Sequence, residues 1–234
     1  MDTNNYINRF IDPTGYANFK ESSRLMFITH RTERYTELQQ IQMVMEGGCD
    51  WVQLRMKERL EIETARKAAA MTASRCVCCL NDHVEMALEA GIDCVHVGKK
   101  DIPVAEAWQI IKEKGRANRF LIGATANTFE DIVQAERQGA SYIGLGPFRF
   151  TYTKKNLSPV LGLEGIQKIV AQCKEAGIQI PIFAIGGILF EDIAALMQTG
   201  ITGIAVSGAL LQATDPVQET KRFIQEIQKF KQHI

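Results

Sequence analysis

The sequence predicts a single (β/α)8 barrel, the TIM-barrel class, preceded by a short N-terminal extension. Three observations carry this prediction: apolar runs alternate with amphipathic segments, there are eight such runs from Leu25 onward, and no linker or shift in composition divides the 234 residues. Alternating strands and helices indicate a parallel sheet, which is either open and doubly wound or closed into a barrel. The count of eight favours the barrel, which typically takes about 250 residues.

The eight apolar runs are predicted to be buried parallel strands. Each is too short for a helix and is bounded by polar residues or glycine. The predicted strands are Leu25–Ile28, Trp51–Leu54, Val77–Leu80, Cys94–Val97, Phe120–Ile122, Tyr142–Leu145, Pro181–Ile185 and Gly203–Val206.

The segments between the runs are predicted to be helices. Their apolar residues recur at steps of three and four, as on the buried face of an amphipathic helix. The predicted helices are Tyr35–Glu46, Glu61–Ser74, His83–Ala90, Val104–Lys114, Thr128–Gln138, Leu163–Ala176, Phe190–Thr199 and Pro216–Phe230. Residues 1–24 precede the first strand and are expected to form a short helix or arm at the bottom of the barrel, so that residues 25–234 make up one catalytic domain.

The charge balance argues against a general nucleic-acid-binding protein. Lys plus Arg is 27 and Asp plus Glu is 27, so the formal net charge is zero, whereas nucleic-acid binding usually needs a basic excess. No apolar run approaches the roughly 20 residues that cross a bilayer, and residues 1–20 contain no apolar signal region. The expected location is therefore cytoplasmic, with no membrane partner. A homo-oligomer is compatible with the sequence, which does not fix the oligomeric state.

The six cysteines are expected to be reduced thiols, because no export signal is present. Cys76, Cys78 and Cys79 cluster, so a metal site has to be considered. However, no second half with ligand spacing follows, and the cluster overlaps a predicted strand. A buried structural role is the favoured interpretation.

Charged side chains follow the second, third and fourth predicted strands, where a barrel places its active site. Gln53 and Arg55 share one face of the second strand, and Lys57 follows them. Arginine and lysine together suit a phosphate or diphosphate. Asp82 and Asp101 end the next two strands and could share one Mg²⁺, which takes one or two carboxylates with phosphate oxygens. The alternative for Arg55 and Lys57 is a solvated charge run, and for the aspartates a helix cap or turn.

A second group of residues, on the last three strands, suits a phosphate held by backbone N–H groups. The stretch from Gly146 to Gly162 is long for a loop, and long loops in compact domains are often functional. Its Thr151, Thr153 and Lys154 are hydrogen-bond donors. Small-residue turns, Gly186-Gly187 and Ser207-Gly208, end the last two strands, where such barrels usually bind phosphate. The two groups together predict two phosphorylated small-molecule substrates in one barrel mouth.

With these residues in view, the chain resembles the thiamine-phosphate synthase (thiamine-phosphate pyrophosphorylase) family. The resemblance runs from about Leu25 to Ile227. It rests on five strand-end motifs in order: QLRMK at 53–57, ND at 81–82, VHVGKKD at 95–101, GPFRFTYTK at 146–154 and AIGGI at 184–188.

The resemblance implies a Mg²⁺-dependent transferase that joins hydroxymethylpyrimidine diphosphate to thiazole phosphate and releases pyrophosphate. It implies that Gln53, Arg55, Lys57, Asn81, Thr125 and Lys154 hold the pyrimidine diphosphate, that Asp82 and Asp101 ligate the metal, and that Thr151, Thr153, Gly187, Ser207 and Gly208 hold the thiazole phosphate. Arg55, Lys57 and Lys154 would stabilise the charge that develops on the leaving pyrophosphate.

The chain departs from the family pattern at four places. Met56 replaces a usual acidic residue, His83 an arginine, and the Thr125–Asn127 segment a Ser-Thr-His run; Ser207-Gly208 replaces Ile-Ser. Two alternatives therefore stay open. One is the related thiazole tautomerase, whose chemistry looks histidine-dependent and which Asn127 disfavours. The other is a non-catalytic barrel that binds a phosphorylated ligand.

Overall fold

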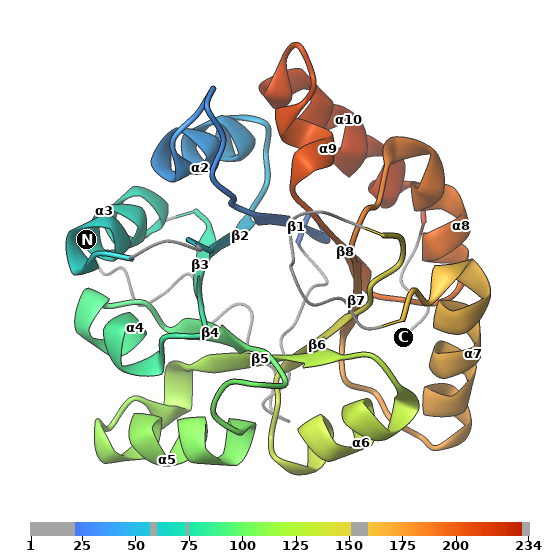
Figure 1. Cartoon of the computed structure of the whole chain (residues 1–234), viewed down its shortest axis with the longest axis horizontal. Coiled ribbons are helices and arrows are strands. Elements are labelled where there is room, and N and C mark those ends of the chain that lie inside the picture. The colour runs from blue at the N-terminus through green and yellow to red at the C-terminus, as the bar shows by residue number, and fades with distance from the viewer. Residues whose placement is uncertain (1–21, 57–59, 74, 151–158, 231–234) are drawn as a thin grey trace.

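A computed structural model of the chain contains eight parallel strands that close into a barrel in chain order, with β8 pairing back onto β1. It describes residues 22–56, 60–73, 75–150 and 159–230. Figure 1 looks down the barrel, with the strands in a ring at the centre. The strands are β1 Leu25–Ile28, β2 Trp51–Leu54, β3 Val77–Asn81, β4 Cys94–Val97, β5 Leu121–Ala126, β6 Tyr142–Leu145, β7 Ile182–Ile185 and β8 Gly203–Val206.

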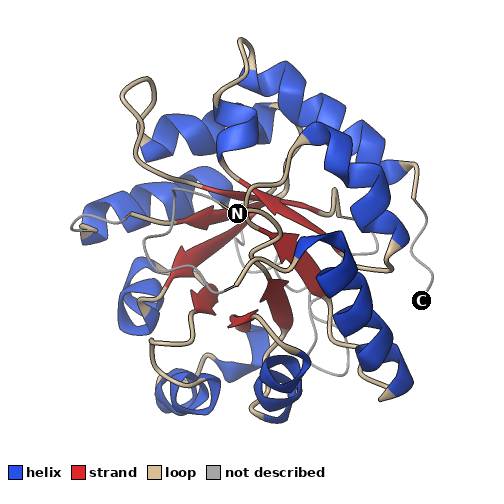
Figure 2. Ribbon diagram, turned by 45° about the vertical axis from the view of Figure 1, so that its right-hand side comes forward, coloured by secondary structure: helices blue, strands red, loops and turns tan. Residues whose placement is uncertain are grey.

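Helices surround the strands on the outside of the barrel, as Figures 1 and 2 show from two directions. Capping boxes fix where two of them begin, because the Thr36 and Thr128 hydroxyls each accept the backbone N–H three residues on. The helices are α2 Glu37–Glu46, α3 Ile62–Thr72, α4 Val84–Ala90, α5 Val104–Glu113, α6 Phe129–Arg137, α7 Gly162–Glu175, α8 Ile193–Gln198, α9 Gly208–Leu211 and α10 Pro216–Gln228, with 3-10 turns at Ala117–Arg119 and Phe190–Asp192.

The predicted fold class is confirmed, and β1, β2, β4, β6 and β8 have the predicted bounds. The predicted end of the fifth strand was wrong, because β5 continues through Gly123 to Ala126. Small residues hid this extension, yet each of them pairs with β6, from Gly123 opposite Tyr142 to Ala126 opposite Leu145. The short helix α9 was not predicted, because four residues are too few to show a helical period.

Strand alternation divides the core into two layers. Alternate residues face outward and pack against the helices, whereas the others fill the barrel. Trp51 and Tyr142 meet edge to face inside it, with ring centroids 5.4 Å apart, and Tyr142 meets Phe183 in the same way at 6.2 Å. All three side chains are fully buried. The barrel interior is therefore a packed core, and Trp51, the first residue of a predicted buried strand, lies in it.

Gly123 makes room for this packing. A Cβ there would lie 2.2 Å from Tyr142 Cζ and 2.5 Å from His96 Nδ1. We expect Gly123→Ala to lower the free energy of unfolding by about 2 kcal/mol, because two rings would have to shift inside a filled barrel. Thermal or urea unfolding measures this. Gly208→Ala is the control, since its Cβ would meet only the end of the Gln212 side chain, at 3.4 Å; equal stability of the two variants would contradict the argument.

All six cysteines are buried free thiols. Burial raises the pKa of Cys78 to about 12, so this thiol stays protonated at neutral pH. The predicted buried structural role of the Cys76–Cys79 cluster is thus confirmed.

Ser23 and Arg24, just before β1, form hydrogen bonds with other parts of the barrel. The Ser23 hydroxyl donates to the Asp50 carboxylate at 2.6 Å. The Arg24 guanidinium donates to the Ile227 and Phe230 carbonyls, at 2.7 and 2.5 Å, at the end of α10. Residues 1–21 lie outside the described residues, so the division into an extension at 1–24 and a barrel at 25–234 stays a prediction.

Candidate functional site

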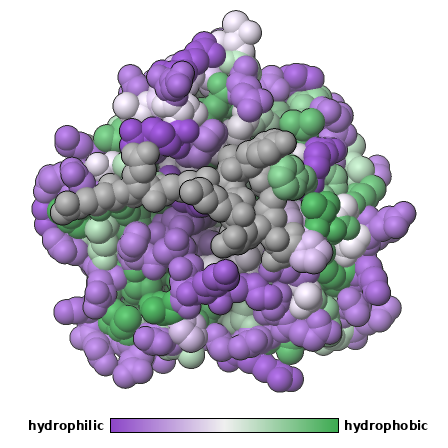
Figure 3. Space-filling view, viewed as in Figure 1, coloured by the Kyte–Doolittle hydropathy of each residue, from purple (hydrophilic) through white to green (hydrophobic). Residues whose placement is uncertain are grey.

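A cavity of about 780 Å³ lies at the carboxyl ends of the strands, and residues from all eight strand ends line it. The alternation that fills the barrel also lines this cavity. Two residues beyond an inward-facing core position, the next inward side chain reaches the mouth: Gln53 follows Trp51 in this way, and Thr125 follows Gly123. Around the barrel axis, the described surface in Figure 3 is mostly hydrophilic, with separate small apolar patches.

Two amides form a pair on one wall of the cavity. Gln53 Nε2 at the end of β2 donates to Asn81 Oδ1 at the end of β3, at 2.6 Å. Gln53 is only 3% exposed. Because each amide has donors and acceptors left over, the pair can bind a planar heterocycle that carries both kinds of group.

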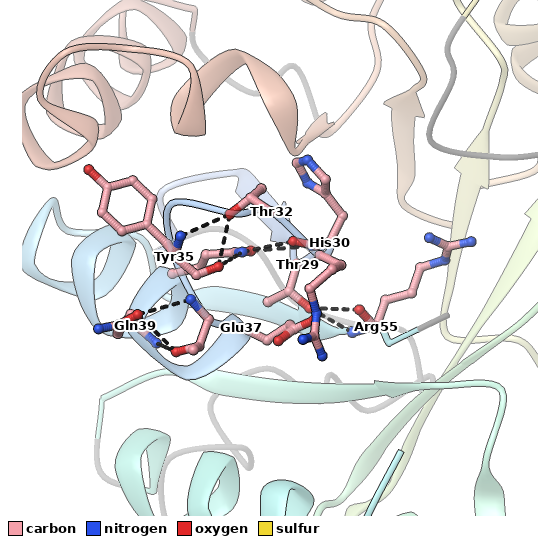
Figure 4. A network of polar contacts seen from close by, with 10 residues as sticks. Thr29, His30, Thr32, Tyr35, Glu37, Gln39 and Arg55 are labelled. Atoms are coloured by element: carbon pink, nitrogen blue, oxygen red, sulfur yellow. Dashed lines mark hydrogen bonds and ion pairs between the residues drawn. The ribbon is translucent and has the colours of Figure 1, made fainter. Parts of the chain in front are cut away.

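Arg55 extends from the same wall, and Thr29 at the end of β1 fixes its backbone. The buried Thr29 hydroxyl accepts the Arg55 N–H at 2.8 Å and donates to the Arg55 carbonyl at 3.0 Å. Figure 4 shows this pair of bonds, with the guanidinium extending away from Thr29. Burial lowers the pKa of Arg55 and the charge of Asp82 opposes that shift, so a guanidinium and a carboxylate act on each other here.

Asp82 and Asp101 line the same cavity. Asp82 has a positive φ of 68°, and its N–H bonds to the His96 carbonyl at 2.9 Å. The alternative reading of the aspartates as helix caps was wrong: His83 is the N-cap of α4 and Pro103 that of α5, neither with a side-chain capping bond. The turn reading holds for Asp101, whose Oδ2 accepts the Gly98 N–H at 2.7 Å.

His96 joins the cavity to the barrel core. Its Nε2 lies 3.0 Å from the Thr125 hydroxyl and its Nδ1 lies 3.3 Å from the Tyr142 hydroxyl. The residue is 7% exposed, as expected for its place within a predicted buried strand. It also holds the Thr125 side chain in place at the cavity wall.

The opposite wall consists of backbone rather than charged side chains. Gly186 and Gly187 have φ values of 102° and 66°, which other residues rarely adopt. A Cβ on Gly187 would lie 3.0 Å from Arg149 Cβ, so this turn packs closely on the loop after β6. The hydroxyl of Ser207, which follows β8, donates to the Ile28 carbonyl at 2.5 Å and lies 2.7 Å from His30 Nδ1.

The comparisons with known proteins agree with this geometry. The model of the family described as thiamine monophosphate synthase matches residues 25–210. A thiamine-phosphate synthase of Bacteroides fragilis is 55% identical over 204 residues, which cover 86% of this chain and 98% of the relative. Another from Bacteroides thetaiotaomicron is 51% identical over 204 residues, with 86% and 95% covered.

The chain belongs to this family. The thiamine phosphate pyrophosphorylase of Pyrococcus furiosus has the same fold, with a TM-score of 0.77 and 27% identity, over 91% of this chain and 99% of that one. Membership in the thiamine monophosphate synthase family therefore rests on sequence and on structure together, and it confirms the resemblance drawn from the strand-end motifs.

The structure brings nine predicted site residues of this family member into one cavity. They are Gln53, Arg55, Asn81, Asp82, Asp101, Thr125, Gly187, Ser207 and Gly208. Lys57, Thr151, Thr153 and Lys154 lie outside the described residues, so their assigned roles stay predictions.

Several cavity residues of this synthase-family chain were not predicted, among them Thr29, His30 and Asn127; Asn127 was noted only as a departure. Thr29 and His30 directly follow β1, so the strand-end rule that identified the other walls would have found them. Asn127 Nδ2 donates to the Gly146 carbonyl at 2.5 Å, which links the loops after β5 and β6. Its role is visible only once those loops are neighbours.

The Ser207 hydroxyl supports the turn after β8 rather than offering a donor to a ligand, because its single hydrogen is committed to the Ile28 carbonyl. We expect Ser207→Ala to change KM for either substrate by less than about tenfold, and to lower the free energy of unfolding by about 1 kcal/mol. Steady-state kinetics and thermal unfolding measure the two effects. A loss of activity beyond a hundredfold with unchanged stability would show that the hydroxyl binds substrate.

Among the described helices, none combines the length and the apolar character of a membrane span.

Proposed function

We propose that this chain joins hydroxymethylpyrimidine diphosphate to thiazole phosphate and releases pyrophosphate, with Mg²⁺ as the cofactor. The observation that carries the proposal is the division of one cavity into two unlike walls. Amides, a guanidinium and two carboxylates line one wall, and glycine-rich backbone lines the other. A diphosphate with its metal suits the first wall, and a monophosphate held by N–H groups suits the second.

The donor set fits Mg²⁺. Asp82 and Asp101 follow neighbouring strands and face one cavity. Within residues 22–56, 60–73, 75–150 and 159–230, no group of three or more His, Cys, Asp or Glu side chains is placed to hold a metal. Two carboxylates and a substrate that supplies phosphate oxygens are the usual ligands of this ion. When bound, Mg²⁺ would neutralise charge on the diphosphate.

The side chains of the first wall would bind the pyrimidine and stabilise its leaving group. The Gln53–Asn81 pair would orient the ring by its remaining donors and acceptors. The bond between the methylene carbon and the diphosphate oxygen breaks, and its electron pair leaves with pyrophosphate. Arg55 would stabilise that charge as it forms, together with Lys57 and Lys154. The thiazole nitrogen supplies the electron pair of the new carbon–nitrogen bond, so no side-chain nucleophile is needed.

The second wall would hold the thiazole phosphate. Gly187 and the Ser207-Gly208 turn would offer backbone N–H groups to the phosphate, with Thr151 and Thr153 contacting the same substrate. This arrangement keeps the thiazole opposite the pyrimidine wall and orients its nitrogen toward the methylene carbon, and such positioning lowers the barrier of a reaction between two molecules.

Two alternatives make different demands on the cavity. A thiazole tautomerase needs a proton-transferring group near position 127, and the Asn127 amide donates to the Gly146 carbonyl instead. A barrel that only binds phosphorylated ligands has no use for a metal-dependent leaving-group site.

Pyrophosphate release with both substrates present tests the proposal. The full chain should release pyrophosphate only when both phosphorylated substrates are supplied, and only with Mg²⁺ present. Single-substrate reactions and a reaction with excess chelator are the controls. Thiazole conversion without the pyrimidine would favour the tautomerase, and tight binding of both substrates without turnover would favour the non-catalytic barrel.

A further inference from the structure

An ion pair links the loop after β6 to the turn after β7. Arg149 follows β6, and Asp192 lies in the 3-10 turn after β7. The two terminal nitrogens of the Arg149 guanidinium donate to the Asp192 carboxylate, Nη1 to Oδ2 at 2.8 Å and Nη2 to Oδ1 at 2.9 Å. Nη1 also donates to the Gly187 carbonyl at 2.6 Å. The third bond sets this pair apart from an ordinary surface ion pair, because it reaches backbone that lines the cavity.

Backbone hydrogen bonds also join the loop after β6 to the turn after β7. The Phe148 N–H donates to the Ile185 carbonyl and the Arg149 N–H to the Gly186 carbonyl, both at 2.8 Å. The Arg149 side chain donates to the next carbonyl, that of Gly187. The carbonyls of residues 185, 186 and 187 therefore all point toward residues 148–149. In a trans peptide the C=O and the following N–H point in opposite directions. The N–H groups of Gly187 and Ile188 therefore point away from residues 148–149.

The Arg149–Asp192 pair keeps its charges across the neutral range. Burial alone would raise the pKa of Asp192, but hydrogen bonds from Arg149 and from the Leu189 N–H lower it below its ordinary value of 3.8. Because the folded-state pKa is depressed, the contribution of the pair is present above that value and is lost only as pH falls through the lowered pKa. The ion pair therefore stays charged at every pH in the neutral range.

We propose that Arg149 is a positioning residue for the synthase reaction: with Asp192 holding its guanidinium, it fixes the Gly187 carbonyl and thereby orients the Gly187 and Ile188 N–H groups toward the thiazole phosphate. The inference rests on the function proposed above. Arg149 does not contact substrate in this account, since its bonds go to Asp192 and to the Gly187 carbonyl. Its effect is on the geometry of the phosphate cradle.

Arg149→Ala tests the inference, with Arg66→Ala as a matched control. Both arginines pair with carboxylates and are about equally exposed, at 45% and 47% for the side chain. Arg149 also bonds to the cavity residue Gly187, whereas Arg66 pairs with Glu63 and Glu89, which do not line the cavity. Arg149→Ala should raise KM for thiazole phosphate about tenfold, the size of one charge-assisted hydrogen bond. KM for the pyrimidine diphosphate should change by less than about threefold, because the backbone bonds of residues 148–149 remain. Arg66→Ala should match the unchanged protein.

Two further variants and a binding measurement keep the test decisive. Arg149→Lys keeps the charge without the planar fork, so it should recover only part of the affinity. Combining Arg149→Ala with Asp192→Asn should cost no more than Arg149→Ala alone, because asparagine can still accept the Leu189 N–H and the two residues act as one unit. Calorimetric titration of thiazole phosphate should show the same tenfold weakening as KM. If Arg149→Ala does not fold, Arg149→Lys carries the comparison.

An unchanged affinity for thiazole phosphate in Arg149→Ala, or an equal rise in both KM values, would overturn the inference. The proposed function fails separately. An unchanged protein that binds thiazole phosphate but releases no pyrophosphate would contradict the synthase reaction, while the titration still tests Arg149. An unchanged protein that binds no thiazole phosphate would overturn both.

Discussion

Asp82→Asn and Asp101→Asn are each expected to lower Mg²⁺-dependent pyrophosphate release by about 10²-fold or more, as the loss of one preorganised electrostatic group does. Asparagine is the sharper choice at both positions. At Asp82 it tolerates the positive φ of 68°, whereas alanine would add backbone strain. At Asp101 its side-chain oxygen can still accept the Gly98 N–H, so the turn is kept and only the charge is lost.

The Mg²⁺ dependence separates loss of the metal site from a general defect. Each variant should also need a higher Mg²⁺ concentration for half-maximal rate, while its thermal transition stays near that of the unchanged protein. Glu89→Gln is the control, because it removes an exposed carboxylate of α4 that pairs with Arg66 and does not line the cavity. Near-normal Mg²⁺-dependent turnover in both aspartate variants would show that these carboxylates do not hold the metal.

Arg55→Ala is expected to lower kcat/KM for the pyrimidine diphosphate by about 10²- to 10³-fold, because the guanidinium stabilises charge that develops on the leaving group. The variant should fold. The Thr29 hydroxyl bonds to the backbone of residue 55 rather than to its side chain, so the strand end keeps its support. Initial rates at varied pyrimidine diphosphate, together with thermal unfolding, measure the two effects.

Arg66→Ala serves again as the control arginine for this measurement. If Arg55→Ala loses its thermal transition, Arg55 supports the structure and its assignment to the leaving group is wrong. If it folds and turns over normally, the guanidinium has no part in the reaction.

Strand alternation explains why so much of the site could be predicted from the sequence. A period of two fixes which side chains point inward, and parallel strands bring their carboxyl ends to one rim. Gln53, Arg55 and Asn81 could thus be placed in one cavity without knowledge of the loops. The rule needs only correct strand ends, and β2 ends where its sequence predicts.

Features that depend on contacts between loops were beyond this reasoning. Arg149 and Asp192 are 43 residues apart, and no periodicity connects them. The continuation of β5 was hidden because Gly123 and Ala124 resemble a turn by composition, although the ring of Tyr142 requires a glycine beside it. The commitment of the Ser207 hydroxyl to β1 appears only when the barrel closes and brings the first and last strands together.

The packed aromatic layer beneath the cavity limits how ligands can enter and leave the site. Trp51, Tyr142 and Phe183 are all less than 2% exposed, so their side chains close the described barrel beneath the cavity. Ligands therefore reach the cavity only from its open end, at the carboxyl ends of the strands. With the pyrimidine on the buried Gln53–Asn81 wall, as proposed above, both substrates would enter and both products would leave through that same open end.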